Sequence, residues 1–174
     1  GNEMGCLLLN YILSQKTQED ILPKGSIAVK TIVTSELTRK IANKYGVELK
    51  NVLTGFKYIG SIITDLEKHM NRSKFVFGFE ESYGYLAGTF VRDKEAVSTS
   101  LLIAEMTEYY KTLNKTLIDA LDDLYEEFGC YKHRMLDFYF EGAEGDKKMQ
   151  ELLEHFRTHN FKEIIGYKVL NKVD

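Results

Sequence analysis

The chain has 174 residues, 44% of them hydrophobic, and this size allows one well-buried core with a smaller second unit. Its 23 Lys and Arg against 26 Asp and Glu give a formal net charge of -3, so the chain as a whole does not attract nucleic acid or anionic membranes. No apolar run approaches the roughly 20 residues of a membrane-spanning helix, so we expect neither a nucleic-acid nor a membrane partner.

The chain up to residue 79 alternates between two patterns of apolar residues. Spacings of three and four residues indicate helices, and β-branched runs such as 26–33 indicate buried strands. We expect helices over 3–15 (with Asn2 as the cap), over 34–46 and from about residue 60, and strands over 26–33, 47–53 and 74–79. This alternation predicts a three-layer-like α/β domain with a mostly parallel mixed sheet.

Two further helices are predicted before residue 130. The first spans about 94–113. Its apolar positions that we expect to be buried are Val97, Leu101, Ile103, Ala104 and Met106. The second helix begins at the capping pair Thr116 and Asp119 and ends at Gly129. We therefore place the end of the first domain at residue 130.

Residues 131–174 have a different pattern. A strand over 134–140, a turn near Gly142, a helix through 149–156 and a strand near 164–170 predict a short β-α-β unit. Two strands and one helix bury too little apolar surface to be stable alone. This unit either packs on the first domain or continues in further sequence, and we favour the second. The opening GNEMG likewise suggests a natural N-terminus elsewhere.

The segment GFEESYG, residues 78–84, places two carboxylates and a hydroxyl directly after a buried strand. In open α/β sheets, ligands bind beyond the carboxyl ends of the strands. A carboxylate accepts hydrogen bonds from neighbouring sugar hydroxyls, and Ser82 both donates and accepts, so the segment suits a polyol. The alternative is that Glu80 and Glu81 are solvated turn residues.

Three more segments accompany this loop in a fixed order. VKT (29–31) and TGFKYIG (54–60) precede it, and VRDKE (91–95) follows it. In order and spacing, the four segments resemble the third domain of the α-D-phosphohexomutases, the phosphoglucomutase and phosphomannomutase family. Residues 1–130 resemble that domain, with the end of the second domain at the N-terminus, and residues 131–174 resemble the truncated start of the fourth domain.

The resemblance implies an intramolecular phosphotransferase that interconverts hexose 1-phosphate and hexose 6-phosphate, of glucose or mannose, through a phosphoserine and a bisphosphate intermediate. Glu80 and Ser82 match the residues that hold the hydroxyls at positions 3 and 4 of the hexose. Lys30, Lys57 and Lys94 match lysines that lie near the substrate or its phosphates in this family, and Arg92 neighbours that site. The full expected substrate-binding set is Gly78, Glu80, Glu81, Ser82, Lys30, Lys57, Arg92 and Lys94.

The chemical roles of the lysines are left open by the sequence. A lysine beside a dianionic phosphate is held in its charged form, so we expect Lys30, Lys57 and Lys94 to pair with charge. An acid/base role for Lys57 or Lys94 is the alternative, and taken alone each lysine is more often a solvated surface charge. No catalytic residue is certain in this chain.

The sequence lacks a phosphoserine segment and an Asp-x-Asp-x-Asp metal loop. Phosphoryl transfer without them would lack both a nucleophile and charge neutralisation, so we expect the chain alone to be inactive. The resemblance implies magnesium bound outside these residues, hexose 1,6-bisphosphate as activator or intermediate, and the remaining domains of the same chain as partners. The alternative function is a non-catalytic sugar-phosphate binding or interaction module with the same fold.

Two other residue pairs have weaker interpretations. His155 and His159 have the spacing of paired zinc ligands, but no third ligand is evident, so we expect no metal site there. Cys6 and Cys130 are the only cysteines and lie far apart, which suits free thiols in a reducing cytoplasm, where we expect the protein to be located.

Overall fold

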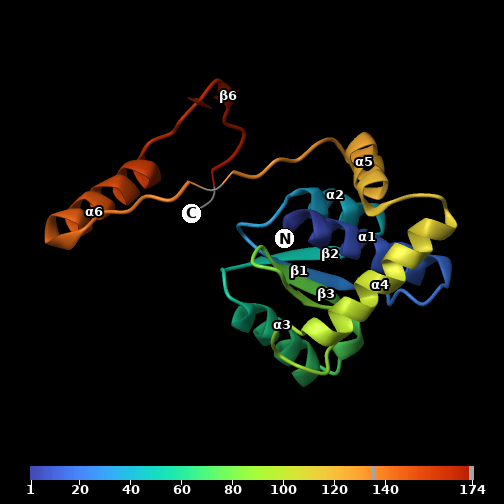
Figure 1. The fold of residues 1–174 in the computed structure, drawn as a ribbon. Coiled ribbons are helices and arrows are strands. Elements are labelled where there is room, and N and C mark those ends of the chain that lie inside the picture. Colours follow the sequence, from blue (N-terminus) through green and yellow to red (C-terminus); the bar gives the residue numbers. More distant parts are fainter. Residues whose placement is uncertain (135, 173–174) are drawn as a thin grey trace. The chain divides into compact units, whose positions relative to one another are not determined.

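The computed structural model describes residues 1–134 and 136–172, and its central feature is a four-stranded sheet (Figure 1). The strands are β1 (Ile27–Thr31), β2 (Glu48–Val52), β3 (Phe75–Glu80) and β4 (Gly84–Leu86). The sheet order is β2-β1-β3-β4, with β1 parallel to β2 and β3 and with β4 antiparallel to β3. The predicted mostly parallel mixed sheet is therefore confirmed, and β4 is an additional edge strand that we did not predict.

Helices cover both faces of this sheet. They are α1 (Asn2–Gln18), α2 (Leu37–Lys44), α3 (Phe56–Lys68), α4 (Ala96–Thr112) and α5 (Leu117–Phe128), and a short 3-10 turn covers Arg72–Lys74. Figure 1 shows α1 and α2 on one face and α3 on the other. None of the helices in the described ranges is long and apolar enough to cross a membrane.

The core is divided by the sheet into two parts. Ala28 and Phe77 face the part formed with α1, α2, α4 and α5, whereas Ile27 and Phe75 face the part formed with α3. Ile27 and Ala28 are adjacent on β1, so alternation along the strand places them on opposite faces. Phe75 and Phe77 also face opposite sides, although they are two residues apart, because the pairing of β1 with β3 has a register irregularity at this point. Every residue of β1 is buried because the strand is covered on both sides, which explains why its first three residues are all apolar.

Helix α1 packs closely on β3. Gly5 lies against Phe79, and a Cβ atom at position 5 would overlap the Phe79 ring. Both residues are buried. Glycine at this position therefore lets α1 approach the strand residue that directly precedes Glu80.

Helix α4 forms where it was predicted, but much of its apolar surface is exposed. Val97 and Leu101 are 80% and 70% exposed, and Ala104 is exposed as well. Met106 is buried and Ile103 is partly buried against the core. The prediction of burial was therefore wrong for Val97, Leu101 and Ala104. Apolar periodicity identifies a helix but not how much of its surface other elements cover.

The helix caps were predicted with mixed success. Thr116 and Asp119 form the expected capping box at the start of α5, and Gly129 ends that helix. The prediction for Asn2 was wrong, because α1 has no side-chain cap and Asn2 lies inside the helix. Its Oδ1 instead accepts a hydrogen bond from the Ser35 backbone N–H at 3.2 Å.

Residues 134–174 form a second compact unit. It contains helix α6 (Gly142–Thr158) and the short antiparallel strands β5 (Glu163–Ile164) and β6 (Tyr167–Lys168). The predicted strand over 134–140 does not form in the described residues, and Met135 lies outside them. The predicted strand near 164–170 is instead a hairpin, since Ile165 and Gly166 both have positive φ, the geometry of a two-residue turn.

Replacing Gly5 with Ala should lower the free energy of unfolding by about 1–2 kcal/mol, measured by urea denaturation. Overpacking a core typically costs about 1–3 kcal/mol, and the helix preference of Ala offsets at most about 1 kcal/mol of it. Ser61→Ala on the exposed side of α3 is the control and should change stability by less than about 0.5 kcal/mol. A Gly5→Ala chain as stable as the wild type would contradict this close contact.

Candidate functional site

The carboxyl ends of the three parallel strands meet at one edge of the sheet. β1 ends at Thr31, β2 at Val52 and β3 at Glu80. The antiparallel strand β4 begins at this same edge, where Gly84 pairs with Glu80. The loops that follow these strands therefore converge where ligands bind in open α/β sheets.

A carboxylate with two donors lies at this edge. The side chain of Glu80 is only 5% exposed, and its Oε1 accepts hydrogen bonds from Lys94 Nζ at 2.9 Å and from Ser82 Oγ at 3.2 Å. The Lys94 side chain is 53% exposed, so the pair joins a buried carboxylate to a cation that is open to solvent. Three of the predicted site residues are thus brought together.

Strand β4 places Lys94 beside Glu80. The Glu95 backbone N–H donates to Tyr85 O at 3.0 Å, which ties the residue after Lys94 to β4. The Glu95 carboxylate then accepts hydrogen bonds from the backbone N–H groups of Val97 and Ser98 and so caps α4. Lys94 is therefore held between the edge strand and the start of a helix.

Gly84 leaves room for the Glu80 side chain. A Cβ atom at position 84 would lie 2.8 Å from both Cγ and Oε1 of Glu80. The two residues are directly paired across the β3 and β4 ladder. Any larger residue at position 84 would therefore displace the carboxylate from its observed position.

Glu81, the second carboxylate of the loop, points to a different partner. Its Oε2 accepts a hydrogen bond from Thr31 Oγ1 at 2.9 Å. Thr31 is fully buried at the end of β1, and Glu81 is half-buried. The two neighbouring glutamates are therefore not equivalent, since only Glu80 contacts Lys94.

Lys30 is a buried cation with its donors already engaged. Its side chain is 0% exposed, and Nζ lies 2.8 Å from Glu36 Oε1, 3.2 Å from Thr34 O and 3.4 Å from Thr31 O. These contacts join the end of β1 to the loop before α2. In this structure they give Lys30 a structural role, and its role toward a substrate stays a prediction.

Arg92 is attached to helix α3. Its Nε donates to Thr64 Oγ1 at 3.2 Å, one terminal nitrogen donates to Thr89 O at 2.7 Å, and the other pairs with Glu67. Arg92 is thus not part of the cluster around Glu80. It fixes the segment before Lys94 to the helix beneath it.

The two remaining predicted residues lie near the start of α3 and within β3. Lys57 is exposed in the first turn of α3, with Nζ 5.0 Å from the centre of the Tyr58 ring. Gly78 is buried, and a Cβ atom there would lie 2.6 Å from Ile59 Cγ2. Glycine at 78 therefore allows α3 to pack closely on β3, which is a structural function.

Two residues at this edge were missed as site candidates. Sequence alone does not single out Thr31, because the predicted strand over 26–33 conceals its place as the last residue of β1. Gly84 marks only the end of the loop in the sequence. Its pairing with Glu80 depends on β4, whose three residues are too few to show a strand pattern.

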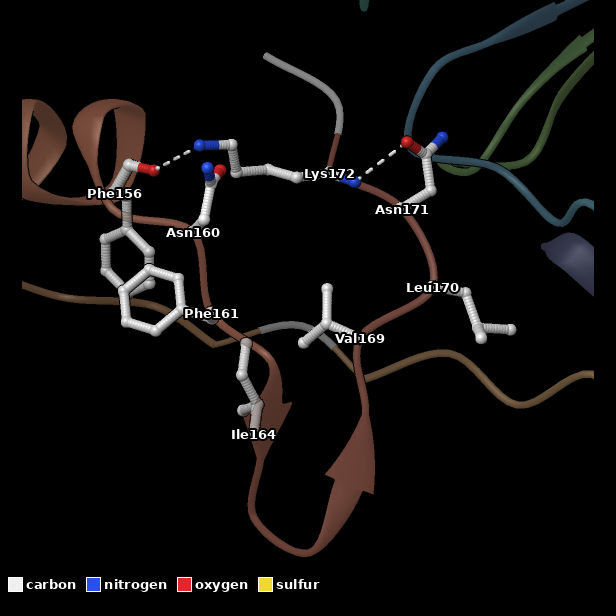
Figure 2. A pocket seen from close by; sticks show the side chains of 8 residues that line it. All are labelled: Phe156, Asn160, Phe161, Ile164, Val169, Leu170, Asn171 and Lys172. Carbon is white, nitrogen blue, oxygen red and sulfur yellow. Dashed lines mark hydrogen bonds between the residues drawn. The ribbon is translucent and has the colours of Figure 1, made fainter.

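The second unit contains a pocket lined by apolar side chains and by Asn160, Asn171 and Lys172 (Figure 2). Lys172 Nζ donates to the carbonyls of Phe156, Arg157 and His159 at 3.2, 2.8 and 3.1 Å, and so satisfies the last turn of α6. The pocket includes none of the predicted site residues. The Lys172 ammonium group thus has a structural role at a helix end.

No group of three or more His, Cys, Asp or Glu side chains that could hold a metal ion occurs in the described part of the chain. His155 and His159 have ring centres 4.2 Å apart. Two imidazole rings do not supply the oxygen ligands that Mg²⁺ prefers, so this pair does not fit a magnesium ion.

The pKa of Lys94 should fall toward its usual 10.5 when Glu80 is replaced by Gln. The hydrogen bond and charge of Glu80 raise the pKa of Lys94, so the pair is intact below pH 10.5 and is lost as the pH rises through the raised value. An NMR titration of the lysine Cε signals measures this change. Lys115, whose pKa is raised by Asp123, is the internal control, and an unchanged Lys94 pKa would argue against the ion pair.

Stability should fall as the pH drops below 4.5, in part through Glu36. Burial alone would raise the pKa of Glu36, but hydrogen bonds from Lys30 and Arg39 outweigh it and lower the pKa. The stabilisation is present above pH 4.5 and is lost as the pH falls through the lowered pKa. Glu36→Gln should therefore unfold more readily at pH 7 and lose less stability on acidification, as measured by urea denaturation at each pH.

The expected loss for Glu36→Gln at pH 7 is only about 1 kcal/mol, because water screens the half-exposed carboxylate and the Gln amide oxygen can still accept a hydrogen bond from Lys30. Glu48→Gln removes a looser exposed pair with Lys50, at 3.8 Å, and should leave both the stability and its pH dependence unchanged. Equal stability and equal pH dependence of the two variants would mean that the contact between Glu36 and Lys30 does not contribute to stability.

Comparison with known proteins relates the chain to one family. The family described as phosphoglucomutase/phosphomannomutase, alpha/beta/alpha domain III, matches residues 1–128. Phosphoglucomutases of Staphylococcus aureus strains MRSA252 and MSSA476 are each 41% identical to the chain over 169 residues, covering 97% of this chain and 29% of each relative. The chain thus spans less than a third of the length of these relatives.

A solved structure supports the same fold. The chain is similar to parafusin, a phosphoglucomutase from Paramecium in its open form, with a TM-score of 0.57 and 21% identity over 90% of this chain and 26% of that chain. At this identity the likeness concerns the fold alone. Since the domain III family matches residues 1–128, from α1 to the end of α5, the chain belongs to the phosphoglucomutase/phosphomannomutase family.

Proposed function

We propose that this chain is the sugar-binding domain of a hexose-phosphate mutase, and that Glu80, Ser82 and Lys94 contact the hexose. The observation that carries the proposal is the buried Glu80 carboxylate at the carboxyl edge of the sheet, with Ser82 and Lys94 on the same oxygen. A carboxylate held in this way can accept from adjacent hydroxyls of a sugar. Family membership supplies the reaction class.

The reaction itself explains why a hydroxyl-binding loop is useful. A mutase of this kind transfers a phosphoryl group from an enzyme phosphoserine to a hexose phosphate and then takes the other phosphoryl group back. The P–O bond to serine breaks as the P–O bond to the sugar hydroxyl forms. The bisphosphate then reverses its orientation within the site before the second transfer. Both ends of the sugar must reach one serine, so the contacts must grip hydroxyls that occupy nearly the same place in both orientations.

The hydroxyls at positions 3 and 4 meet this requirement. Glu80 and Ser82 are neighbours on the loop and are suited to adjacent hydroxyls. Contacts confined to these positions do not distinguish glucose from mannose, which differ in configuration at position 2. We therefore propose a substrate class of hexose 1- and 6-phosphates that includes both sugars.

Electrostatic assistance is assigned to the lysines. Lys94 is largely exposed and can approach a phosphate or a hydroxyl while it remains near Glu80. Its raised pKa keeps it protonated at neutral pH, which favours charge pairing over a role as general base. Lys57, exposed at the start of α3, is the second candidate for a phosphate contact.

The remaining chemistry is proposed to lie in other domains of the same protein. The phosphoserine and the Mg²⁺ that neutralises the transferring phosphoryl group would both come from outside these 174 residues. Hexose 1,6-bisphosphate would be the intermediate and activator. The chain alone would then bind sugar weakly and turn nothing over.

In the full-length mutase, Glu80→Gln should lower kcat/KM for glucose 1-phosphate by about tenfold to a hundredfold. A hydrogen bond to a charged group contributes about 1.5–3 kcal/mol, and every 1.4 kcal/mol corresponds to about tenfold. Gly84→Ala, which keeps the glutamate but displaces its carboxylate, should act in the same direction. Steady-state kinetics with glucose and mannose 1-phosphates measures both variants.

Glu127→Gln is the matched control, because it removes a different Glu–Lys pair, with Lys44 at 2.8 Å, between α2 and α5. Its kcat/KM should equal that of the wild type. Unchanged kinetics in Glu80→Gln would refute the proposed contact. A full-length wild-type protein that binds hexose phosphate without converting it would instead favour the alternative of a non-catalytic binding module.

A further inference from the structure

The loop between β3 and β4 is short and strained. Only residues 81–83 connect Glu80 to Gly84, which are paired across the ladder. Tyr83, the last residue of the loop, has a φ of 61°. Three-residue hairpin loops commonly have a left-handed residue at this position, and glycine is favoured there. A tyrosine there costs conformational energy, so contacts outside the loop must hold this geometry.

One of these contacts comes from β1, the strand next to β3. Thr31 Oγ1 donates to Glu81 Oε2 at 2.9 Å, and Thr31 is fully buried. Because the acceptor is a carboxylate oxygen, this hydrogen bond belongs to the stronger, charge-assisted class. A rigid strand thus holds the first residue of the loop by its side chain.

A second contact comes from the start of α1. A Cβ atom on Gly1 would overlap the Glu81 carbonyl oxygen, so the backbones of these residues lie against each other. Tyr85 Oη donates to Gly1 O at 2.9 Å, and burial raises the pKa of Tyr85 to about 12, so its phenol remains a donor at neutral pH. The Glu81 backbone is therefore packed on one side while its side chain is fixed by Thr31.

These contacts separate the roles of the two glutamates. Glu80 is bound by Ser82 and Lys94, which reach it from the loop and from the start of α4. Glu81 is bound by Thr31 beneath the loop. A carboxylate with a buried donor in the neighbouring strand is suited to anchor the loop rather than to hold a sugar.

We propose that Thr31 is a positioning residue, which anchors Glu81 and thereby holds the loop so that Glu80 and Ser82 face the hexose hydroxyls. The inference rests on the proposed function of this loop. It also reassigns Glu81 from substrate contact to anchor. Thr31 touches no substrate and acts only through Glu81.

The test uses kinetics of the full-length mutase with glucose 1-phosphate. Thr31→Val removes the hydroxyl at nearly constant volume and should lower kcat/KM by about tenfold, the effect of losing one charge-assisted hydrogen bond. Thr31→Ser restores the hydroxyl and should recover most of the activity. Glu81→Ala should match Thr31→Val, and the double variant should be no worse than either single variant.

Thr38→Val is the matched structural control. Thr38 is also fully buried and also donates through its hydroxyl, to Ser35 O in the loop before α2, so its hydrogen bond lies outside the loop of residues 81–83. It should lower the melting temperature without lowering kcat/KM. If Thr31→Val does not fold, the kinetics of Glu81→Ala test the inference instead. That variant removes the same hydrogen bond by changing its half-buried partner.

Several results would overturn the inference. These are wild-type kinetics in Thr31→Val, equal losses of activity in Thr31→Val and Thr38→Val, failure of Thr31→Ser to rescue, or a Glu81→Ala loss far greater than that of Thr31→Val. Glu80→Gln is run in parallel. If Glu80→Gln is impaired while Thr31→Val is not, only the inference fails, and if Glu80→Gln is unaffected, the proposed function fails and the inference with it.

Discussion

The antiparallel pairing of β4 with the end of β3 is the constraint on which the candidate site depends. It sets Gly84 opposite Glu80, and the lack of a side chain at Gly84 gives the carboxylate its space. It also presents Tyr85 O to the Glu95 N–H, so that α4 starts beside the sheet and Lys94 reaches Glu80. One short edge strand thus connects a buried carboxylate, its cationic partner and a helix cap.

The charged groups at this edge fall into two kinds with different uses. Lys30 is fully buried and its contacts with Glu36 and two carbonyls hold β1 to the loop before α2. Lys94 is more than half exposed and shares a single carboxylate with Ser82. A buried cation that loses its partner is costly, whereas an exposed one exchanges partners cheaply, so Lys94 is the better candidate for contact with a substrate.

The sequence predicted the parallel part of the fold because β1 and β3 lie in buried, largely apolar runs and each helix has its own periodicity. The third parallel strand, β2, is exposed or half-buried along its length. The sequence did not predict β4, whose three residues carry no pattern and form a strand only because β3 provides an edge. The strand predicted over 134–140 was wrong for the related reason that β-propensity alone supplies no pairing partner. In 164–170, the turn at Gly166 divides one apparent strand into two.

The candidate site was predictable in its location but not in its contacts. Polar residues after a buried strand indicated Glu80, Glu81 and Ser82, yet sequence could not tell which glutamate faces Lys94 and which faces Thr31. Those distinctions depend on the register between β1, β3 and β4. Arg92 likewise contacts α3, through Thr64 and Glu67, which lie 28 and 25 positions earlier in the chain. Sequence spacing alone does not reveal these contacts.

The most direct test of the central claim is a crystal structure of the full-length protein with bound glucose 1-phosphate. We predict that the Glu80 carboxylate and Ser82 Oγ each lie within hydrogen-bond distance of neighbouring sugar hydroxyls, with Lys94 still beside the carboxylate and Glu81 still bound to Thr31. A bound sugar whose hydroxyls are held entirely by other residues, with Glu80 contacting only Lys94 and Ser82, would contradict the account.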